Sequence, residues 1–120
     1  MPDEVIAAYH DAWNAPDAQT RRRLLERSLT PDAELIDPRG GRFSGRDAID
    51  RRLAGFGERF AGARVDLTSA VDEHNGYARY SWTITDRDGD AVLDGIDVTQ
   101  RAADGRIGLV IMFFGDLPAA

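Results

Sequence analysis

The apolar run from Leu109 to Phe114 restricts the fold of this chain more than any other segment. It is far shorter than the roughly 20 residues that a membrane-spanning helix needs, so we expect no membrane span. In the wider segment from Ile107 to Phe114, both faces of an extended chain would be apolar. Such a strand is typical of the centre of a sheet, with other structure packed on each of its sides.

The segment before this strand predicts further β-structure. Alternating apolar and polar side chains indicate strands within residues 64–71, 78–84 and 91–101. Asn75-Gly76 lies between the first two and is the strongest short hairpin signal of the chain. Gly95 interrupts the third strand and indicates a β-bulge there. With the final strand, these segments predict a four-strand antiparallel meander.

The N-terminal segment predicts two helices and a short strand. Apolar positions of the first helix recur every three to four residues, at Val5, Ile6, Tyr9 and Trp13. Asp17 is a suitable N-cap for the second helix, whose inner stripe is Leu24, Leu25 and Leu29. Thr30 and the residues after it would end that helix. A strand from Ala33 to Asp37 follows, and its period of two places Asp37 on the side of Leu35.

A third helix is predicted after the glycine-containing turn at residues 38–41. Ser44-Gly45-Arg46-Asp47 resembles a capping box, with Asp47 in place of the usual Glu. The inner stripe of this helix is Ile49, Leu53, Phe56 and Phe60. Three helices against one curved sheet make a two-layer α+β domain with a cavity between its layers. We expect residues 1–120 to form one such domain.

Composition excludes several classes of chemistry. The chain has no cysteine and all 15 basic residues are arginines, so thiolate nucleophiles and lysine Schiff bases are absent. His10 and His74 are too few for a three-histidine zinc site, and we expect neither a metal nor an organic cofactor. A formal net charge of −6 argues against nucleic-acid binding. Residues 1–4 lack a signal-peptide pattern, which predicts a cytoplasmic protein.

Six short segments resemble the SnoaL-like branch of the nuclear transport factor two-like superfamily: AYHDAWN, ELIDP, FSGRDAI, GIDV, ADGRI and FFG. The resemblance covers nearly the whole chain. It implies a cone-shaped α+β fold, in which a curved and mostly antiparallel sheet packs against three N-terminal helices. The superfamily includes polyketide cyclases, ketosteroid isomerases, dehydratases, epoxide hydrolases and non-catalytic binding domains, so the resemblance implies the fold more narrowly than the function.

A comparison with ketosteroid isomerases assigns candidate catalytic residues. The positions that match the isomerase motif are Tyr9 in the first helix, Asp37 before Pro38, and Asp97 in the penultimate strand. The resemblance implies that Asp37 is the general base, while Tyr9 and a protonated Asp97 donate hydrogen bonds to the oxyanion. The isomerases have a further tyrosine in the third helix, where this chain has Leu53.

Each of these residues also has a structural alternative. Tyr9 could be a core tyrosine, and Asp37 could bind the amides of the turn that follows it. Asp97 requires a cause, because Asp is disfavoured within strands. Its alternative role is an ion pair with Arg79 or Arg101.

Core residues are expected to line the cavity and contact a ligand. The candidates for substrate binding are Trp13, Phe56, Trp82, Met112 and Phe114.

His10 points about 100° away from Tyr9 around the first helix, so we expect it at the surface or at the helix edge.

These observations favour an enzyme that acts on a small apolar carbonyl compound by proton transfer beside the carbonyl. The reaction would be a double-bond isomerisation or an aldol cyclisation. One alternative is a non-catalytic domain that binds a hydrophobic metabolite. Another is a dimeric interaction module whose pocket is filled by its own side chains. We also expect a homodimer through the outer face of the sheet, because one layer of helices cannot cover both of its apolar faces.

Overall fold

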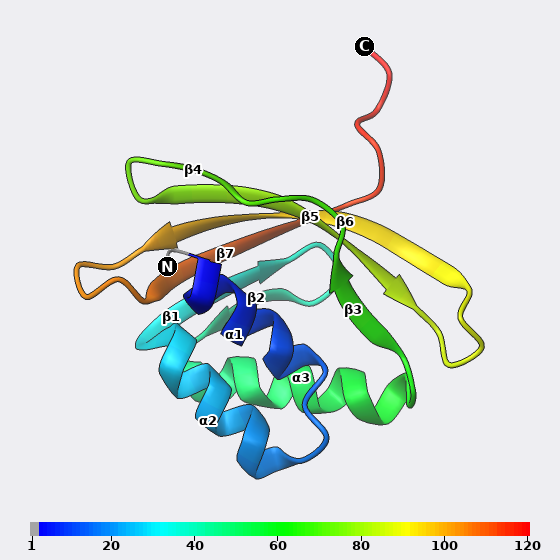
Figure 1. Cartoon of the computed structure of the whole chain (residues 1–120), viewed down its shortest axis with the longest axis horizontal. Coiled ribbons are helices and arrows are strands. Elements are labelled where there is room, and N and C mark those ends of the chain that lie inside the picture. Colours follow the sequence, from blue (N-terminus) through cyan, green and yellow to red (C-terminus); the bar gives the residue numbers. More distant parts are fainter. Residues whose placement is uncertain (1–2) are drawn as a thin grey trace.

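The computed structural model describes residues 3–120, which contain three helices and seven strands. In chain order they are α1 (Asp3–Trp13), α2 (Ala18–Ser28), β1 (Leu29–Asp37), β2 (Gly41–Ser44), α3 (Arg46–Arg59), β3 (Arg64–Leu67), β4 (Asp72–His74), β5 (Tyr77–Thr85), β6 (Ala91–Arg101) and β7 (Ile107–Phe114). The helices lie together against one face of a strongly curved sheet (Figure 1). The predicted two-layer α+β fold is confirmed.

The strands of residues 3–120 form one sheet in the order β2-β1-β7-β6-β5-β3, with β4 also paired to β5. β1 runs parallel to β7, and the other pairs are antiparallel. The prediction that β7 is central is confirmed, because it lies between β1 and β6. The prediction that both faces of β7 are covered is wrong for the single chain. Met112 is buried under the helices, whereas Phe113 on the opposite face is 57% exposed.

The second helix is shorter than predicted. It ends at Ser28, and Leu29 begins β1, where it pairs with Ile107 of β7. Leu29 is fully buried. Its apolar side chain therefore packs in the core as part of the sheet and not as part of the helix. The predicted N-cap is confirmed, because the Asp17 carboxylate accepts a hydrogen bond from the Thr20 amide at 2.7 Å.

The predicted capping box before α3 is wrong. Gly45 is the N-cap, with φ of +91° and no capping side chain. Ser44 instead ends β2, a strand that the sequence analysis did not predict, and its hydroxyl binds the Glu34 carboxylate at 3.3 Å. Phe60 is also misplaced in the inner stripe: α3 ends at Arg59, and Phe60 is 49% exposed.

Asn75-Gly76 makes the predicted hairpin turn, here between β4 and β5. Their φ angles of 53° and 80° place both residues in the left-handed region that this turn requires. The strand expected within residues 64–71 is shorter, because β3 ends at Leu67, and an unpredicted strand, β4, starts at Asp72. Both pair with β5, at different ends of that long strand.

The predicted bulge at Gly95 is absent. Gly95 pairs with Trp82 in an unbroken part of the β5–β6 register. The glycine is needed because the Trp82 ring lies over it and leaves no room for a side chain.

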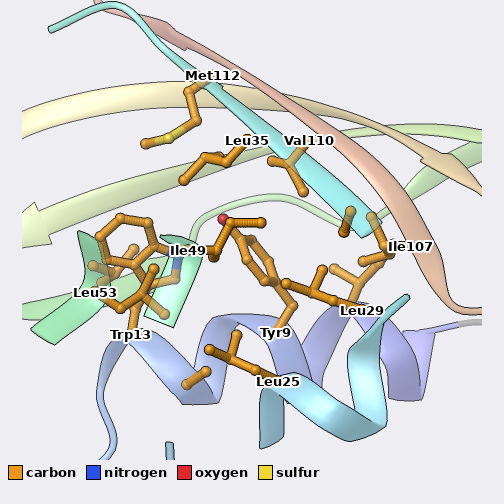
Figure 2. Packing of buried hydrophobic residues seen from close by; sticks show 14 of the residues in the cluster. Tyr9, Trp13, Leu25, Leu29, Leu35, Ile49, Leu53, Ile107, Val110 and Met112 are labelled. Carbon is orange, nitrogen blue, oxygen red and sulfur yellow. The ribbon is translucent and has the colours of Figure 1, made fainter. Parts of the chain in front are cut away.

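The core lies between the helices and the concave face of the sheet. Figure 2 shows Tyr9 and Trp13 of α1 directed toward Leu35, Val110 and Met112 of the strands. None of the helices in the described part of the chain is long and apolar enough to cross a membrane.

Candidate functional site

A cavity of about 170 Å³ opens between the helices and the sheet. Its walls come from α1, α3, β5, β6, β7 and the turn after β1, and consist of Trp13, Arg39, Arg52, Phe56, Phe60, Ile84, Val92, Leu93, Met112 and Phe114. Four of the five predicted substrate-binding residues line it. The exception is Trp82, which lies behind the wall and packs edge-on against Phe114 with ring centroids 5.7 Å apart.

Tyr9 extends from α1 toward the sheet (Figure 2). The side chain is 1% exposed, and the hydroxyl has no hydrogen-bond partner among the described residues. Burial raises the pKa of this hydroxyl well above 10.0, and the charges of Asp97 and Asp37 raise it further. The nearby Trp13 ring N–H partly offsets the rise in pKa, although the two groups lack hydrogen-bond geometry.

The Tyr9 hydroxyl is therefore a neutral, buried donor close to two carboxylates. Buried hydroxyls nearly always have a partner in folded proteins. An unpaired one can still donate a hydrogen bond to an oxygen atom that reaches it.

Asp97 lies on the inner face of β6 and is 1% exposed. Its Oδ1 accepts a hydrogen bond from Trp82 Nε1 at 2.8 Å. Its Oδ2 accepts one from the Tyr80 hydroxyl at 3.0 Å and lies 3.1 Å from His10 Nε2. The Tyr80 hydroxyl and His10 Nε2 are themselves 3.1 Å apart, so these two atoms and Asp97 Oδ2 form a closed triangle. Burial raises the pKa of Tyr80 well above 10.0, and the Asp97 charge adds to that rise in pKa.

The alternative that pairs Asp97 with an arginine is wrong. Arg79 points to the outer face of β5 and binds Asp72 at 2.8 Å. Arg101 follows an irregularity at the end of β6 and pairs with Glu73 of β4. Asp97 is thus partnered by neutral ring donors and one histidine.

Of the two positions predicted for His10, the surface position is wrong, because its side chain is only 5% exposed. The curved sheet wraps beside α1, so a position at the edge of the inner stripe is covered by Tyr80. His10 packs edge-on against both Tyr9 and Tyr80. Its Nδ1 has no partner among the described residues. Local periodicity indicates the inward direction of Tyr80, but no local signal indicates that His10 reaches β6.

Asp37 ends β1 and is 3% exposed, on the same side as Leu35 as predicted. Its Oδ1 accepts hydrogen bonds from the backbone amides of Arg39 and Gly40, at 2.9 and 3.3 Å. The turn-binding alternative is therefore present in the structure. Oδ2 is held by two atoms of Arg52, Nε at 3.0 Å and Nη2 at 2.8 Å. Arg52 was not predicted to be a partner of Asp37.

Of the predicted catalytic residues, both carboxylates are near enough to Tyr9 for their charges to raise the pKa of its hydroxyl. None of Tyr9, Asp37 and Asp97 belongs to the described wall of the cavity. Arg52 connects Asp37 to that wall, and its guanidinium stacks over Trp13 at 5.6 Å from the ring centroid. A guanidinium in an apolar cavity can stabilise negative charge on an oxygen atom of a ligand.

Residues 3–120 hold no cluster of His, Cys, Asp or Glu side chains arranged to bind a metal ion.

Comparison with solved structures places the fold among known relatives. A SnoaL-like family protein from Agrobacterium tumefaciens strain C58, proposed to be an isomerase, is 29% identical, with a TM-score of 0.88 over 94% of this chain and 96% of that one. A proposed polyketide cyclase from Sinorhizobium meliloti is 21% identical, with a TM-score of 0.72 over 92% and 94%. An NTF2-like protein from Exiguobacterium sp. 255-15 is 18% identical, with a TM-score of 0.76 over 94% and 99%.

Among proteins of curated function, none matches the sequence significantly. Residues 6–109 match the family model of the SnoaL-like domain. This match covers most of the chain and agrees with the motifs and with the curved sheet. The chain therefore belongs to the SnoaL-like domain family.

Proposed function

We propose that this protein is an isomerase- or cyclase-type enzyme that transfers a proton beside the carbonyl of a small apolar molecule. The observation that carries the proposal is the Tyr9 hydroxyl, which is buried, unpaired among the described residues and close to both Asp37 and Asp97. Membership of the SnoaL-like family supports a role of this type. The aromatic cavity, which Trp13 of the same helix lines, suits an apolar substrate.

In this proposal Tyr9 donates a hydrogen bond to the substrate oxygen as an enolate forms. Arg52 lies in the cavity wall and adds a positive charge near that oxygen. Asp37 accepts the proton from the carbon. It becomes a better base when Arg52 turns from its carboxylate toward the developing oxyanion, because the carboxylate then loses two donors.

Asp97 has a different proposed role, because its oxygens are already bound by His10, Tyr80 and Trp82. A buried carboxylate beside Tyr9 would repel an enolate unless its charge is balanced. We propose that the three side chains bound to Asp97 offset its charge. Asp97 and His10 then act as positioning residues for Tyr9.

A second function is favoured by a specific observation. Both carboxylates are fully occupied by hydrogen bonds in this structure. A pocket whose candidate base is bound in this way suits a non-catalytic domain that binds a hydrophobic metabolite. The experiment must therefore separate binding from proton transfer.

The probe is 2-tetralone, an apolar bicyclic ketone with exchangeable protons beside its carbonyl. Binding is followed by quenching of tryptophan fluorescence, since Trp13 lines the cavity. Proton transfer is followed by deuterium incorporation beside the carbonyl in heavy water, detected by nuclear magnetic resonance. Loss of a general base or of an oxyanion donor costs on the order of a hundredfold in rate, so Asp37→Asn and Tyr9→Phe should each slow exchange by about that factor.

Matched controls are available on exposed positions of the sheet. Tyr77→Phe and Asp94→Asn make the same chemical changes at side chains outside the cavity wall, and both should exchange like wild type. Accelerated exchange that depends on Tyr9 and Asp37 supports the enzyme. Binding of the ketone without accelerated exchange contradicts it and supports the binding domain.

A further inference from the structure

Arginine side chains gather at the mouth of the candidate site. Arg39 and Arg52 line the cavity of about 170 Å³. A larger cavity of about 450 Å³ adjoins it, sharing both arginines and adding Arg51 and Arg59. Among the described residues that line these cavities there is no carboxylate. This is a local excess of positive charge in a chain whose formal net charge is −6.

Arg39 and Arg52 differ in how their charges are balanced. Arg52 is neutralised by the buried carboxylate of Asp37. Arg39 is exposed, and within residues 3–120 no carboxylate pairs with its guanidinium. It stacks over the Phe114 ring at 5.4 Å from the centroid, so its charge is held at the edge of the apolar wall.

This combination selects a particular class of ligand. The aromatic wall accepts an apolar, ring-shaped body. A guanidinium at its edge matches the planar geometry of a carboxylate and can bind it through two parallel hydrogen bonds. Arg59 extends the positive surface and stacks over Phe60 at 5.9 Å. A neutral ketone would leave the charge of Arg39 without a counterpart.

We propose that the natural ligand is an apolar carbonyl compound that also carries a carboxylate, with its rings in the cavity and the carboxylate on Arg39. The carbonyl part of this statement rests on the proposed function. The carboxylate part rests on the arginines alone.

The test compares 2-naphthoate with its methyl ester, which has the same rings without the charge. Affinities are measured by quenching of tryptophan fluorescence. Wild type should bind the acid about tenfold more tightly than the ester, as one charge-assisted contact at a partly exposed site allows. The preference should shrink as salt is added. Arg39→Gln should reduce it to within about twofold, and Arg39→Lys should keep part of it, because Lys retains the charge without the planar fork.

Arg27→Gln is the matched control, because it removes one exposed positive charge from the last turn of α2, away from both cavities. It should leave the preference for the acid unchanged. Equal binding of acid and ester by wild type overturns the proposal, and so does a preference that survives in Arg39→Gln. Neither result depends on proton transfer. Ketone exchange without a preference for acids therefore refutes this inference alone, whereas a preference for acids without exchange refutes the enzyme alone.

Discussion

Gly95 of β6 lies directly across from Trp82 of β5, and a Cβ atom at Gly95 would come within 2.1 Å of Cζ2 of the Trp82 ring. The ring cannot easily move away, because its Nε1 donates to Asp97 and its edge packs against Phe114. Because Gly95 has no side chain, the Trp82 ring can lie where its Nε1 donates a hydrogen bond to Asp97.

Gly95→Ala should lower the free energy of unfolding by about 3 kcal/mol, since overpacking at a rigid ring forces strain into the sheet. Chemical denaturation followed by circular dichroism measures the change. Gly57→Ala is the control: this helical glycine has nothing within 4 Å of an added Cβ, and it should gain roughly 0.5 to 1 kcal/mol. Equal stability of the two variants would contradict the role of Gly95.

Stability should fall at alkaline pH because of the buried tyrosines. The pKa values of Tyr9 and Tyr80 are raised well above 10.0 in the folded chain, mainly by burial. Below pH 10.0 both hydroxyls are protonated in the folded and in the unfolded chain. Neither tyrosine then makes the free energy of unfolding depend on pH. Above pH 10.0 the unfolded chain releases their protons and the folded chain does not, so the free energy of unfolding falls by up to about 1.4 kcal/mol per pH unit for each tyrosine.

Urea denaturation at a series of pH values above 10.0 checks this slope. Tyr9→Phe removes one of the two groups and loses no hydrogen bond that the structure describes, so it should fold and show about half the dependence. A slope identical to that of wild type would argue that Tyr9 is not protected from solvent.

The Asp37–Arg52 ion pair should contribute to stability. Arg52→Gln leaves the buried Asp37 carboxylate with only the turn amides as partners. We expect the free energy of unfolding to fall by about 2 kcal/mol. This is less than the full cost of breaking a buried ion pair, because the Arg52 side chain is 24% exposed. Arg51→Gln changes an exposed neighbour on α3 and should stay within about 0.5 kcal/mol of wild type.

Adding Asp37→Asn to Arg52→Gln removes the charge that was left unpaired. The double variant should therefore lose less than the sum of the two single changes. Strictly additive losses, measured by the same denaturation experiment, would show that the two side chains do not interact.

A homodimer through the outer face of the sheet remains our prediction. Phe113 and Ile96 face each other across β7 and β6 and are 57% and 43% exposed in the single chain. Apolar surface of this kind favours a partner. Sedimentation at micromolar concentration should give a dimer for wild type and a monomer for Phe113→Arg. Leu117→Arg, in the exposed segment after β7, should remain dimeric. A monomeric wild type would rule out the interface.

Much of the fold follows from local patterns in the sequence. Asn75-Gly76 forms its hairpin because both residues tolerate positive φ. Alternation correctly predicted the strand within residues 78–84, in which Tyr80 and Trp82 face the core. β2 was missed because four mostly exposed residues carry no periodicity, and they form a strand only by pairing with β1.

The family and the order of the helices and the longer strands were thus determined by the sequence itself, since turns, caps and side-chain periodicity act between near neighbours. The partners of the buried polar groups were decided only by the tertiary structure. Asp97 is held by His10, which is 87 residues away, and the curvature of the sheet brings them together. Asp37 pairs with Arg52, and not with another arginine, because α3 packs beside the end of β1. Arginines have the same donors wherever they lie, so the residue type indicates that a pair can form and only the packing of the elements determines which one does.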